Sequence, residues 1–299
     1  MSALPGILRR RGPLIGKDVV NLSGLDSFTA WRECSCSDQL RRRIVGRRYL
    51  RLDRRVKGYA RLSPSIMREF LNYTVVGSAG TEEQIDQLAG RLAAGIHLIS
   101  RRKKELAREA ICRTVESCEK GPLLGEQACI IIAGDVVYGM AHDESRPEPS
   151  TGELVRGSDL DVIIVADGLP PEVLTPFDEL LYREKHSLLL NPAAREEIDY
   201  VIKDLQTVQE QLKFDNFRAM VACKILEEGE FLYGSRPLYR RIKKLIEEAG
   251  IPEKLDRLRQ KAQSGRLAAE KKLLALAGSP PADELATLFY TTEEREEIF

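Results

Sequence analysis

The sequence predicts an α/β (α+β) fold: a mixed sheet flanked by helices, with a small basic module before it and a helical extension after it. Three observations support this prediction. Between residues 81 and 235, short runs rich in Val and Ile and bounded by glycine alternate with stretches of helical periodicity. Positive charge is concentrated at the N-terminal end of the chain. After residue 235 the pattern is helical only.

Residues 1–80 are predicted to form the basic N-terminal module. Residues 1–70 carry 16 Lys and Arg against 6 Asp and Glu, whereas the rest of the chain carries 30 against 40. This excess suits RNA or DNA as a partner; docking on the acidic part of the same chain or of a protein partner is the alternative. One or two strands and then a helix, begun by Ser63-Pro64, suit a small α+β module of the winged-helix kind.

Residues 81–235 are predicted to form the core. One long helix is expected over 81–119, with the basic cluster RRKK at 101–104 on its solvated face. The other expected elements of the core are strands within 128–140, 159–168, 196–205 and 230–235, helices over 171–190 and 206–228, and a polar loop over 142–158. The C-terminal helical region, 236–299, is expected to hold helices at 237–248, 252–276 and 281–298.

Composition favours a cytoplasmic protein without membrane contact. No stretch reaches the roughly 18 uninterrupted apolar residues that a membrane helix needs, and the N-terminus lacks the pattern of a signal peptide. The six cysteines are expected to be reduced thiols. Cys34 and Cys36 form a close pair, but no second pair of ligands follows at the spacing of a zinc site.

The run RGSDLDVIIV holds the strongest chemical signal. Side chains two apart on a strand share one face, so the carboxylates of Asp159 and Asp161 are expected to lie together. Two adjacent carboxylates repel each other unless a cation lies between them, and Mg²⁺ prefers carboxylate and phosphate oxygens. Gly157 and Ser158 come directly before, and backbone N–H groups with a hydroxyl there are candidates for cradling phosphate.

Asp199 is the candidate for a third metal ligand. It lies within the apolar run Ile198–Ile202, where a carboxylate is costly to bury unless it is paired or bound to metal. If this strand lies beside the first, three acids can hold two Mg²⁺ ions, with Mn²⁺ as an alternative. One ion would lower the pKa of an attacking hydroxyl and the other would stabilise the triphosphate and pyrophosphate.

These motifs resemble those of the polymerase-β-type nucleotidyltransferase superfamily over roughly residues 125–235. The run GSDLDVIIV is similar to its metal motif, and Asp199 matches the later acid. The stretch VVYGMA…SDLDVIIV is similar to minimal nucleotidyltransferases of bacterial toxin–antitoxin and resistance systems. TGELVRGSDLDVIIV resembles the acid segment of oligoadenylate and cyclic-dinucleotide synthases. The resemblance implies an enzyme that transfers a nucleoside monophosphate from a nucleoside triphosphate, ATP included, to a hydroxyl and releases pyrophosphate, with a role in phage defence as one setting.

The resemblance also implies a glycine-serine turn that holds the triphosphate. The candidates are Gly134-Asp135 and Gly139-Met140, and neither offers the serine hydroxyl. Gly139-Met140 is favoured, because Tyr138 and Gly139 reproduce an aromatic-glycine turn and the spacer to Asp159 is shorter. Lys224 corresponds to a helix lysine that reaches the triphosphate in several relatives, although a surface role is an alternative.

Several interpretations remain open at this point. His142 either contacts phosphate or is solvated. Arg146 and Arg156 either bind phosphate or neutralise Asp143 or Glu153. The acceptor hydroxyl belongs to a nucleic acid end, a growing oligonucleotide or a protein, with a small antibiotic less favoured because the basic module would be unexplained. The alternative function is that of a nucleic-acid-binding regulator built on a degenerate nucleotidyltransferase scaffold.

Overall fold

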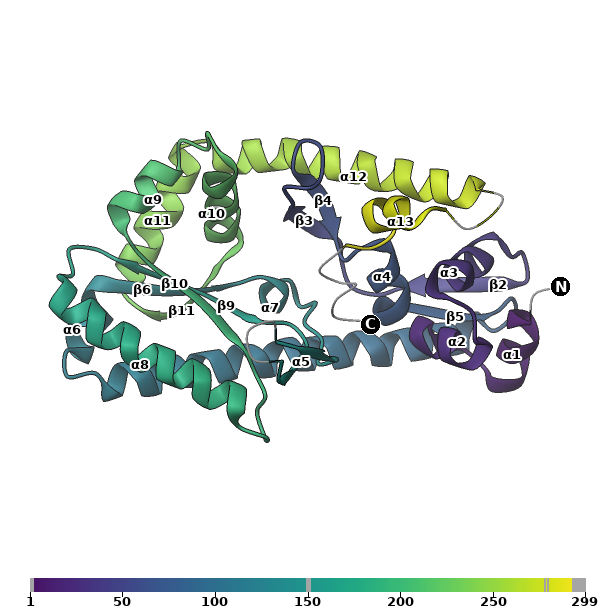
Figure 1. Cartoon of the computed structure of the whole chain (residues 1–299), viewed down its shortest axis with the longest axis horizontal. Coiled ribbons are helices and arrows are strands. Elements are labelled where there is room, and N and C mark those ends of the chain that lie inside the picture. The colour runs from purple at the N-terminus through teal and green to yellow at the C-terminus, as the bar shows by residue number, and fades with distance from the viewer. Residues whose placement is uncertain (1–2, 149–151, 277, 279, 292–299) are drawn as a thin grey trace. The chain divides into compact units, whose positions relative to one another are not determined.

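The computed structural model describes residues 3–148, 152–276, 278 and 280–291 (Figure 1). The chain divides into two compact units. The sheet unit comprises Ile96–Arg257, and the discontinuous unit comprises Met1–Gly95 together with Leu258–Phe299. The division differs from the sequence-predicted boundaries at 80/81 and 235/236. It falls inside two long helices, α5 (Glu82–Ser117) and α12 (Ile251–Ala275), each of which continues across the division without a break.

The sheet unit is built on a mixed four-stranded sheet of order β10-β9-β6-β11. Its strands are β6 (Ala128–Ala133), β9 (Leu160–Ala166), β10 (Ile198–Asp204) and β11 (Glu230–Gly234). β9 pairs with β10 in parallel, whereas the β6–β9 and β6–β11 pairs are antiparallel. The four expected strands therefore form one sheet, and the expectation of a mixed α/β architecture is confirmed.

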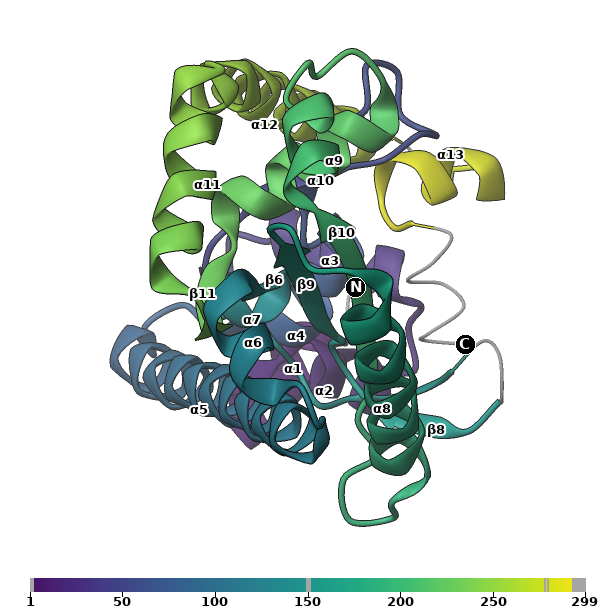
Figure 2. The same ribbon diagram turned by 90° about the vertical axis from the view of Figure 1, so that its left-hand side faces the viewer.

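Helices cover both faces of this sheet (Figures 1 and 2). One face carries the C-terminal part of α5, α6 (Gly121–Gln127) and α8 (Pro171–Leu190), and the other carries α9 (Leu205–Gln211), α10 (Phe217–Glu228) and α11 (Arg236–Glu248). Val162 and Ile164 pack with Ile111 of α5 and Phe177 of α8 in the main core. Because strand side chains alternate, Asp161 faces the opposite side of the sheet, toward α10.

Two segments of the sheet unit differ from the sequence-based expectation. The segment 142–158 was expected to be a loop, but β7 (Ser145–Pro147) and β8 (Leu154–Arg156) pair as an antiparallel hairpin. Both strands have three residues, which is too short to show alternation, and β7 ends in a proline, a residue that predicts a loop. The predicted helix over 206–228 is two helices, α9 and α10. Phe214 between them has φ +59°, and Asn216 caps α10 by accepting a hydrogen bond from the backbone N–H of Ala219.

The discontinuous unit contains a small antiparallel sheet and short helices. Its elements before α5 are α1 (Leu4–Arg11), β1 (Leu14–Ile15), α2 (Gly16–Ser23), α3 (Ser27–Cys36), β2 (Leu40–Ile44), β3 (Tyr49–Leu52), β4 (Ala60–Ser63), α4 (Ile66–Tyr73) and β5 (Thr74–Ser78). The sheet has the order β1-β5-β2, and β3 pairs with β4. The sequence did not predict α1 to α3, which at eight to ten residues are too short for a clear periodicity. Ser65, rather than Ser63, caps α4.

Phe289 belongs to the core of the discontinuous unit. Phe289 is 1% exposed and packs against Phe28 and Trp31, with ring centroids 5.4 Å away in both cases. It follows α13 (Ala282–Leu288), which is shorter than the predicted helix over 281–298, and residues 292–299 of that prediction lie outside the described part. Within the described residues, no helix is both long enough and apolar enough to cross a membrane.

Candidate active site

The register of the sheet places Asp161 directly beside Asp199. β9 and β10 run in parallel, and Asp161 is the register partner of Asp199. On its other side Asp161 is the partner of Ala133, the last residue of β6. Side chains at paired positions lie on the same face of a sheet. Two of the three sequence-predicted acids are therefore neighbours, at the point where β6 ends.

Gly134 makes room for the Asp161 carboxylate. A Cβ atom on Gly134 would lie 2.1 Å from Oδ2 of Asp161, which is closer than atoms can approach. Gly134 also has φ +73°, a conformation that residues with a side chain rarely adopt. The space beside the carboxylate thus exists because residue 134 has no side chain.

The electrostatic environment of Asp161 is unfavourable for its charge. Burial, followed by the negative charges of Asp135, Asp199 and Glu228 and opposed by Lys224, raises the pKa of its carboxyl from 3.8 to about 7. A desolvated carboxylate among like charges is a common feature of functional sites. A cation bound close to Asp161 would reduce the repulsion between these carboxylates.

Asp159, in contrast, is already paired. Arg146 forms an ion pair with its carboxylate. The same guanidinium donates hydrogen bonds to the carbonyl of Gly157 at 2.9 Å and to Oε2 of Glu197 at 2.9 Å. Arg146 therefore neutralises acids, which was one of the two roles expected for it, although the acids are Asp159 and Glu197. In the part of the chain that the structure describes, no three His, Cys, Asp or Glu side chains are close enough together to hold a metal ion.

Asp199 is exposed, which corrects the expectation of a buried carboxylate. Its side chain is 53% exposed and forms an ion pair with Lys185 of α8, with Nζ 2.9 Å from Oδ1. The reason is the position of β10 at the edge of the sheet, where half of an apolar strand remains open to solvent. The buried member of the acid pair is Asp161.

The two candidate phosphate turns lie in different surroundings. Gly134-Asp135 begins the short helix α7 (Asp135–Tyr138) next to Asp161. Gly139 instead faces the ring of His97, and Met140 is 2% exposed, so the turn that the sequence favoured points away from the acids. The contact that distinguishes the two turns is between Gly134 and Asp161, 27 residues later, and it depends on how the strands pair.

The backbone N–H groups of Gly157 and Ser158 donate hydrogen bonds to other backbone carbonyls. The N–H of Gly157 donates to the carbonyl of Glu144 at 2.9 Å, and the N–H of Ser158 donates to that of His142 at 3.0 Å. The hydroxyl of Ser158 donates to Oδ2 of Asp135 at 2.9 Å. Both backbone donors that the sequence assigned to phosphate are thus used within the protein.

Lys224 lies next to α7. Its Nζ is 2.7 Å from Oε2 of Glu228, and it is 5.5 Å from the centre of the Tyr138 ring. Glu228 also accepts hydrogen bonds from the Tyr138 hydroxyl and from the N–H of Gly134 at 3.3 Å. The side chain of Lys224 is only 12% exposed. This lysine is therefore part of the buried charge cluster rather than a solvated surface residue.

Lys103 is a component of the site that the sequence reasoning missed. It is 2% exposed and donates to the carbonyls of Arg156 at 2.7 Å and Ser158 at 2.9 Å, and to Oε2 of Glu196 at 2.5 Å. The cluster RRKK was assigned to a solvated face. However, Lys103 lies four residues before Ala107 and eight before Ile111, on the buried side of α5, and this spacing is a signal that could have found it.

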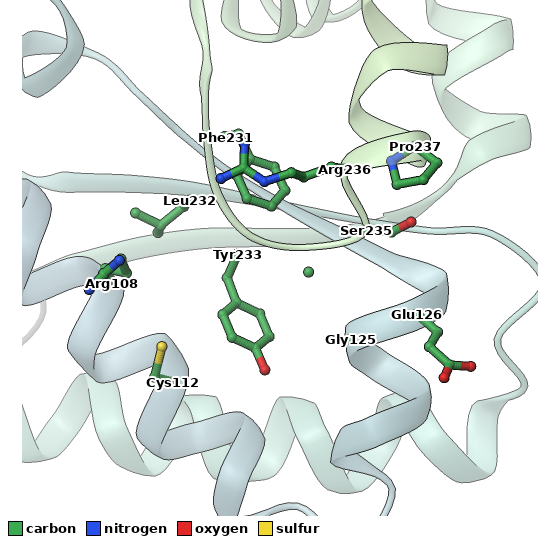
Figure 3. Close-up of a pocket in the computed structure, with 11 residues that line it drawn as sticks. Arg108, Cys112, Gly125, Glu126, Phe231, Leu232, Tyr233, Ser235, Arg236 and Pro237 are labelled. Atoms are coloured by element: carbon green, nitrogen blue, oxygen red, sulfur yellow. The ribbon is translucent and has the colours of Figure 1, made fainter.

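Two hollows adjoin the sheet. A cavity of about 360 Å³ borders Asp161 and Asp199. A larger one of about 800 Å³ lies along β11, between α5, α6 and the start of α11 (Figure 3). There the guanidinium of Arg236 stacks on Phe231, 4.4 Å from the ring centre (Figure 3). Gly234 of that hollow pairs with Cys129 at the start of β6, and Asp161 pairs at its end, so the two hollows are separate.

No known protein family and no curated protein matches this chain. The chemistry of the site must therefore be argued from its own residues. Its defining features are one buried carboxylate with a raised pKa, a second carboxylate in register, and a glycine that leaves space between them and α7.

Asp161→Asn is expected to increase the free energy of unfolding at pH 8 without divalent cations. The folded protein holds a proton at Asp161 more tightly than the unfolded chain does, so stability falls as pH rises from about 4 to about 7. The neutral amide avoids this loss, which is on the order of 2–4 kcal/mol. Chemical unfolding followed by far-UV circular dichroism measures the gain, which should be larger at pH 8 than at pH 5.

Asp167→Asn is the matched control for this prediction. Asp167 lies just after the same strand, is 45% exposed, and pairs with Arg241, which is 55% exposed. Its substitution should change stability by less than about 0.5 kcal/mol. A gain for Asp161→Asn that is equal at both pH values would contradict the raised pKa.

Proposed function

We propose that the chain is a Mg²⁺-dependent nucleotidyltransferase, which transfers a nucleoside monophosphate from a nucleoside triphosphate to a hydroxyl and releases pyrophosphate. The observation that carries this proposal is the register of Asp161 with Asp199, opposite the space that Gly134 leaves. The sequence motif around Asp159 and Asp161 supports it, and so does the mixed sheet, which suits the nucleotidyltransferase type of fold. The superfamily assignment belongs to the same proposal.

The donor chemistry fits Mg²⁺. Asp161 and Asp199 would hold the ion, because carboxylate oxygens are its preferred ligands and its charge would relieve the repulsion that raises the pKa of Asp161. Asp159 can join them. If its carboxylate turns from Arg146 toward the metal, Arg146 still keeps Glu197 as a partner. When bound, the metal would supply charge stabilisation for the triphosphate and lower the pKa of the acceptor hydroxyl.

The remaining residues of the site position these groups. Lys103 holds the carbonyls on either side of Gly157 and the carboxylate of Glu196, and so ties the segment before β9 to the segment before β10. Arg146 ties the β7–β8 hairpin to the same two segments through Gly157 and Glu197. These contacts keep Asp161 and Asp199 in register while the substrates exchange.

The triphosphate is best placed on the β6 side of Asp161. There Gly134 opens space, and Lys224 is the nearest cation of α10. We therefore assign the phosphate turn to Gly134-Asp135. The carboxylate of Asp135 would repel phosphate at this turn, unlike the serine hydroxyl that the resemblance implies. Ser158 lies within reach of the same turn through its bond to Asp135 and can supply a hydroxyl there.

The first test is transfer of label from α-³²P nucleoside triphosphates with Mg²⁺ or Mn²⁺. Wild-type protein is expected to label RNA, DNA, a protein or itself and to release pyrophosphate. Asp161→Asn and Asp199→Asn are each expected to lower the rate at least about 100-fold, since the charge of the transition state is stabilised through these carboxylates. Asp159→Ala should also lower it.

Asp167→Asn is again the control, because it removes a carboxylate after the same strand at a distance from the acid pair. It should retain full transfer. Absence of transfer with wild type under all acceptors, or equal rates for wild type and Asp161→Asn, would rule out the enzyme.

The second candidate function is a nucleic-acid-binding regulator that uses a degenerate nucleotidyltransferase domain as its scaffold. Two observations favour it. Arg146 already forms an ion pair with Asp159, and Asp135 stands where the resemblance implies a serine in the phosphate turn. Under this alternative the basic module carries the activity. A toxin–antitoxin or phage-defence setting is compatible with either function.

For the basic module we expect binding of a labelled 20-nucleotide RNA or DNA that weakens as salt rises from 50 to 300 mM. Lys and Arg that neutralise phosphates release counterions, which produces this dependence. The strand β2 exposes Arg41, Arg42 and Arg43, and their joint replacement by Gln should weaken binding and flatten the salt dependence. Fluorescence anisotropy on the full-length protein measures both quantities.

Replacing Arg240, Lys244 and Lys271 by Gln removes the same charge outside residues 1–70 and serves as the control. Binding that is absent, or that does not respond to salt, would mean that the module contacts a protein surface instead.

A further inference from the structure

We propose that the cavity beside Asp199 is the acceptor site and that it binds the 3′-terminal nucleotide of a nucleic-acid strand, with Tyr182 contacting the base and Lys185 the adjoining phosphate. This inference rests on the proposed function and narrows its acceptor. The cavity has a volume of about 360 Å³, in the range of small-ligand sites. Its lining includes Asp161, Tyr182, Lys185, Asp199, Tyr200 and Val201.

The order of the strands separates the two substrates. Asp161 lies between Asp199 on β10 and Ala133 on β6. The β6 side leads to Gly134, α7 and Lys224, where the triphosphate is placed. The cavity contains residues of β9, β10, α8 and α10 but none of β6 or α7. An acceptor in the cavity would therefore approach the α-phosphorus from the side opposite to the departing pyrophosphate, as an in-line transfer requires.

The surface of the cavity suits a nucleobase. Tyr182 is 56% exposed and Val201 is 47% exposed, so both offer apolar surface to a ligand. The Tyr182 ring packs edge-on against His186 at 4.5 Å between centroids, which limits its motion. The hydroxyl of Tyr200 donates to Oδ1 of Asp178 at 2.8 Å, so this ring is fixed too. Exposed aromatic side chains beside apolar ones are the usual platform for bases of single strands.

The charges of the cavity distinguish between acceptors. Among the described residues that line it, the acids are Asp161 and Asp199, both assigned to the metal, and the cation is Lys185. A polycationic antibiotic would find no free carboxylate there. Lys185 now pairs with Asp199. A divalent ion on Asp199 would replace that contact and leave the ammonium group for a phosphate, which a strand carries and a protein hydroxyl lacks.

The 3′ oxygen of the strand forms a bond to the α-phosphorus of the nucleoside triphosphate. The bond from that phosphorus to the bridging oxygen breaks, and pyrophosphate leaves with the bonding electrons. The hydroxyl proton passes to the Asp199 carboxylate and then to solvent. The strand becomes longer by one nucleotide.

The test measures binding of a 5′-fluorescein-labelled hexaribonucleotide of random sequence to the full-length protein. Mg²⁺ and 300 mM salt are present, the latter to weaken contacts with the basic module. Tyr182→Ala and Lys185→Gln are each expected to raise the Kd about tenfold, the usual effect of losing one stacked base or one phosphate contact. They should raise the KM for the strand in the transfer reaction by a similar factor and leave the KM for the nucleoside triphosphate unchanged.

Arg183→Gln is the control. It removes one positive charge from the same helix at an exposed position outside the cavity, and should change the Kd less than twofold. Equal effects of Lys185→Gln and Arg183→Gln, with no effect of Tyr182→Ala, would overturn the acceptor site while transfer by the wild type leaves the proposed function standing. If binding depends on Tyr182 but the wild type releases no pyrophosphate, the strand-binding site stands and the proposed transferase activity is contradicted.

Discussion

The rest of the site depends on one constraint, the burial of the Asp161 carboxylate among other acids. Its charge is desolvated and faces Asp135, Asp199 and Glu228, with Lys224 as the opposing cation. Such an arrangement lowers the stability of the empty protein at neutral pH, because the folded state must hold a charge that the unfolded chain exposes to water. Proteins retain this kind of cost at functional sites, where a ligand that supplies the missing charge recovers it.

The protein fixes the acid pair through buried cations that do not touch either carboxylate of the pair. Lys103 reaches from α5 to the segments before β9 and β10, and Arg146 reaches to the same segments from the hairpin. A buried ion pair contributes little net stability, but it specifies geometry because its loss leaves an unpaired charge. These two residues therefore explain how a parallel strand pair with an open edge keeps its register at the site.

Local patterns predicted the elements, whereas pairing between distant segments decided the site. The strand around Asp161 and the long helix α5 follow from alternation and periodicity within a few residues. The exposure of Asp199 follows from β10 being an edge strand, and the choice of Gly134 over Gly139 from the end of β6 lying beside Asp161; neither is a property of the local sequence. The same holds for Arg146, which meets Asp159 only because residues 142–158 form a hairpin.

The most direct measurement is calorimetric titration of the full-length protein with Mg²⁺ at pH 8. If Asp161 is the centre of a cation site, wild type binds Mg²⁺ and takes up no protons, while at pH 6 binding releases close to one proton as the carboxyl ionises. Asp161→Asn would abolish both the binding and the proton release. Equal Mg²⁺ affinity in wild type and Asp161→Asn would contradict the account.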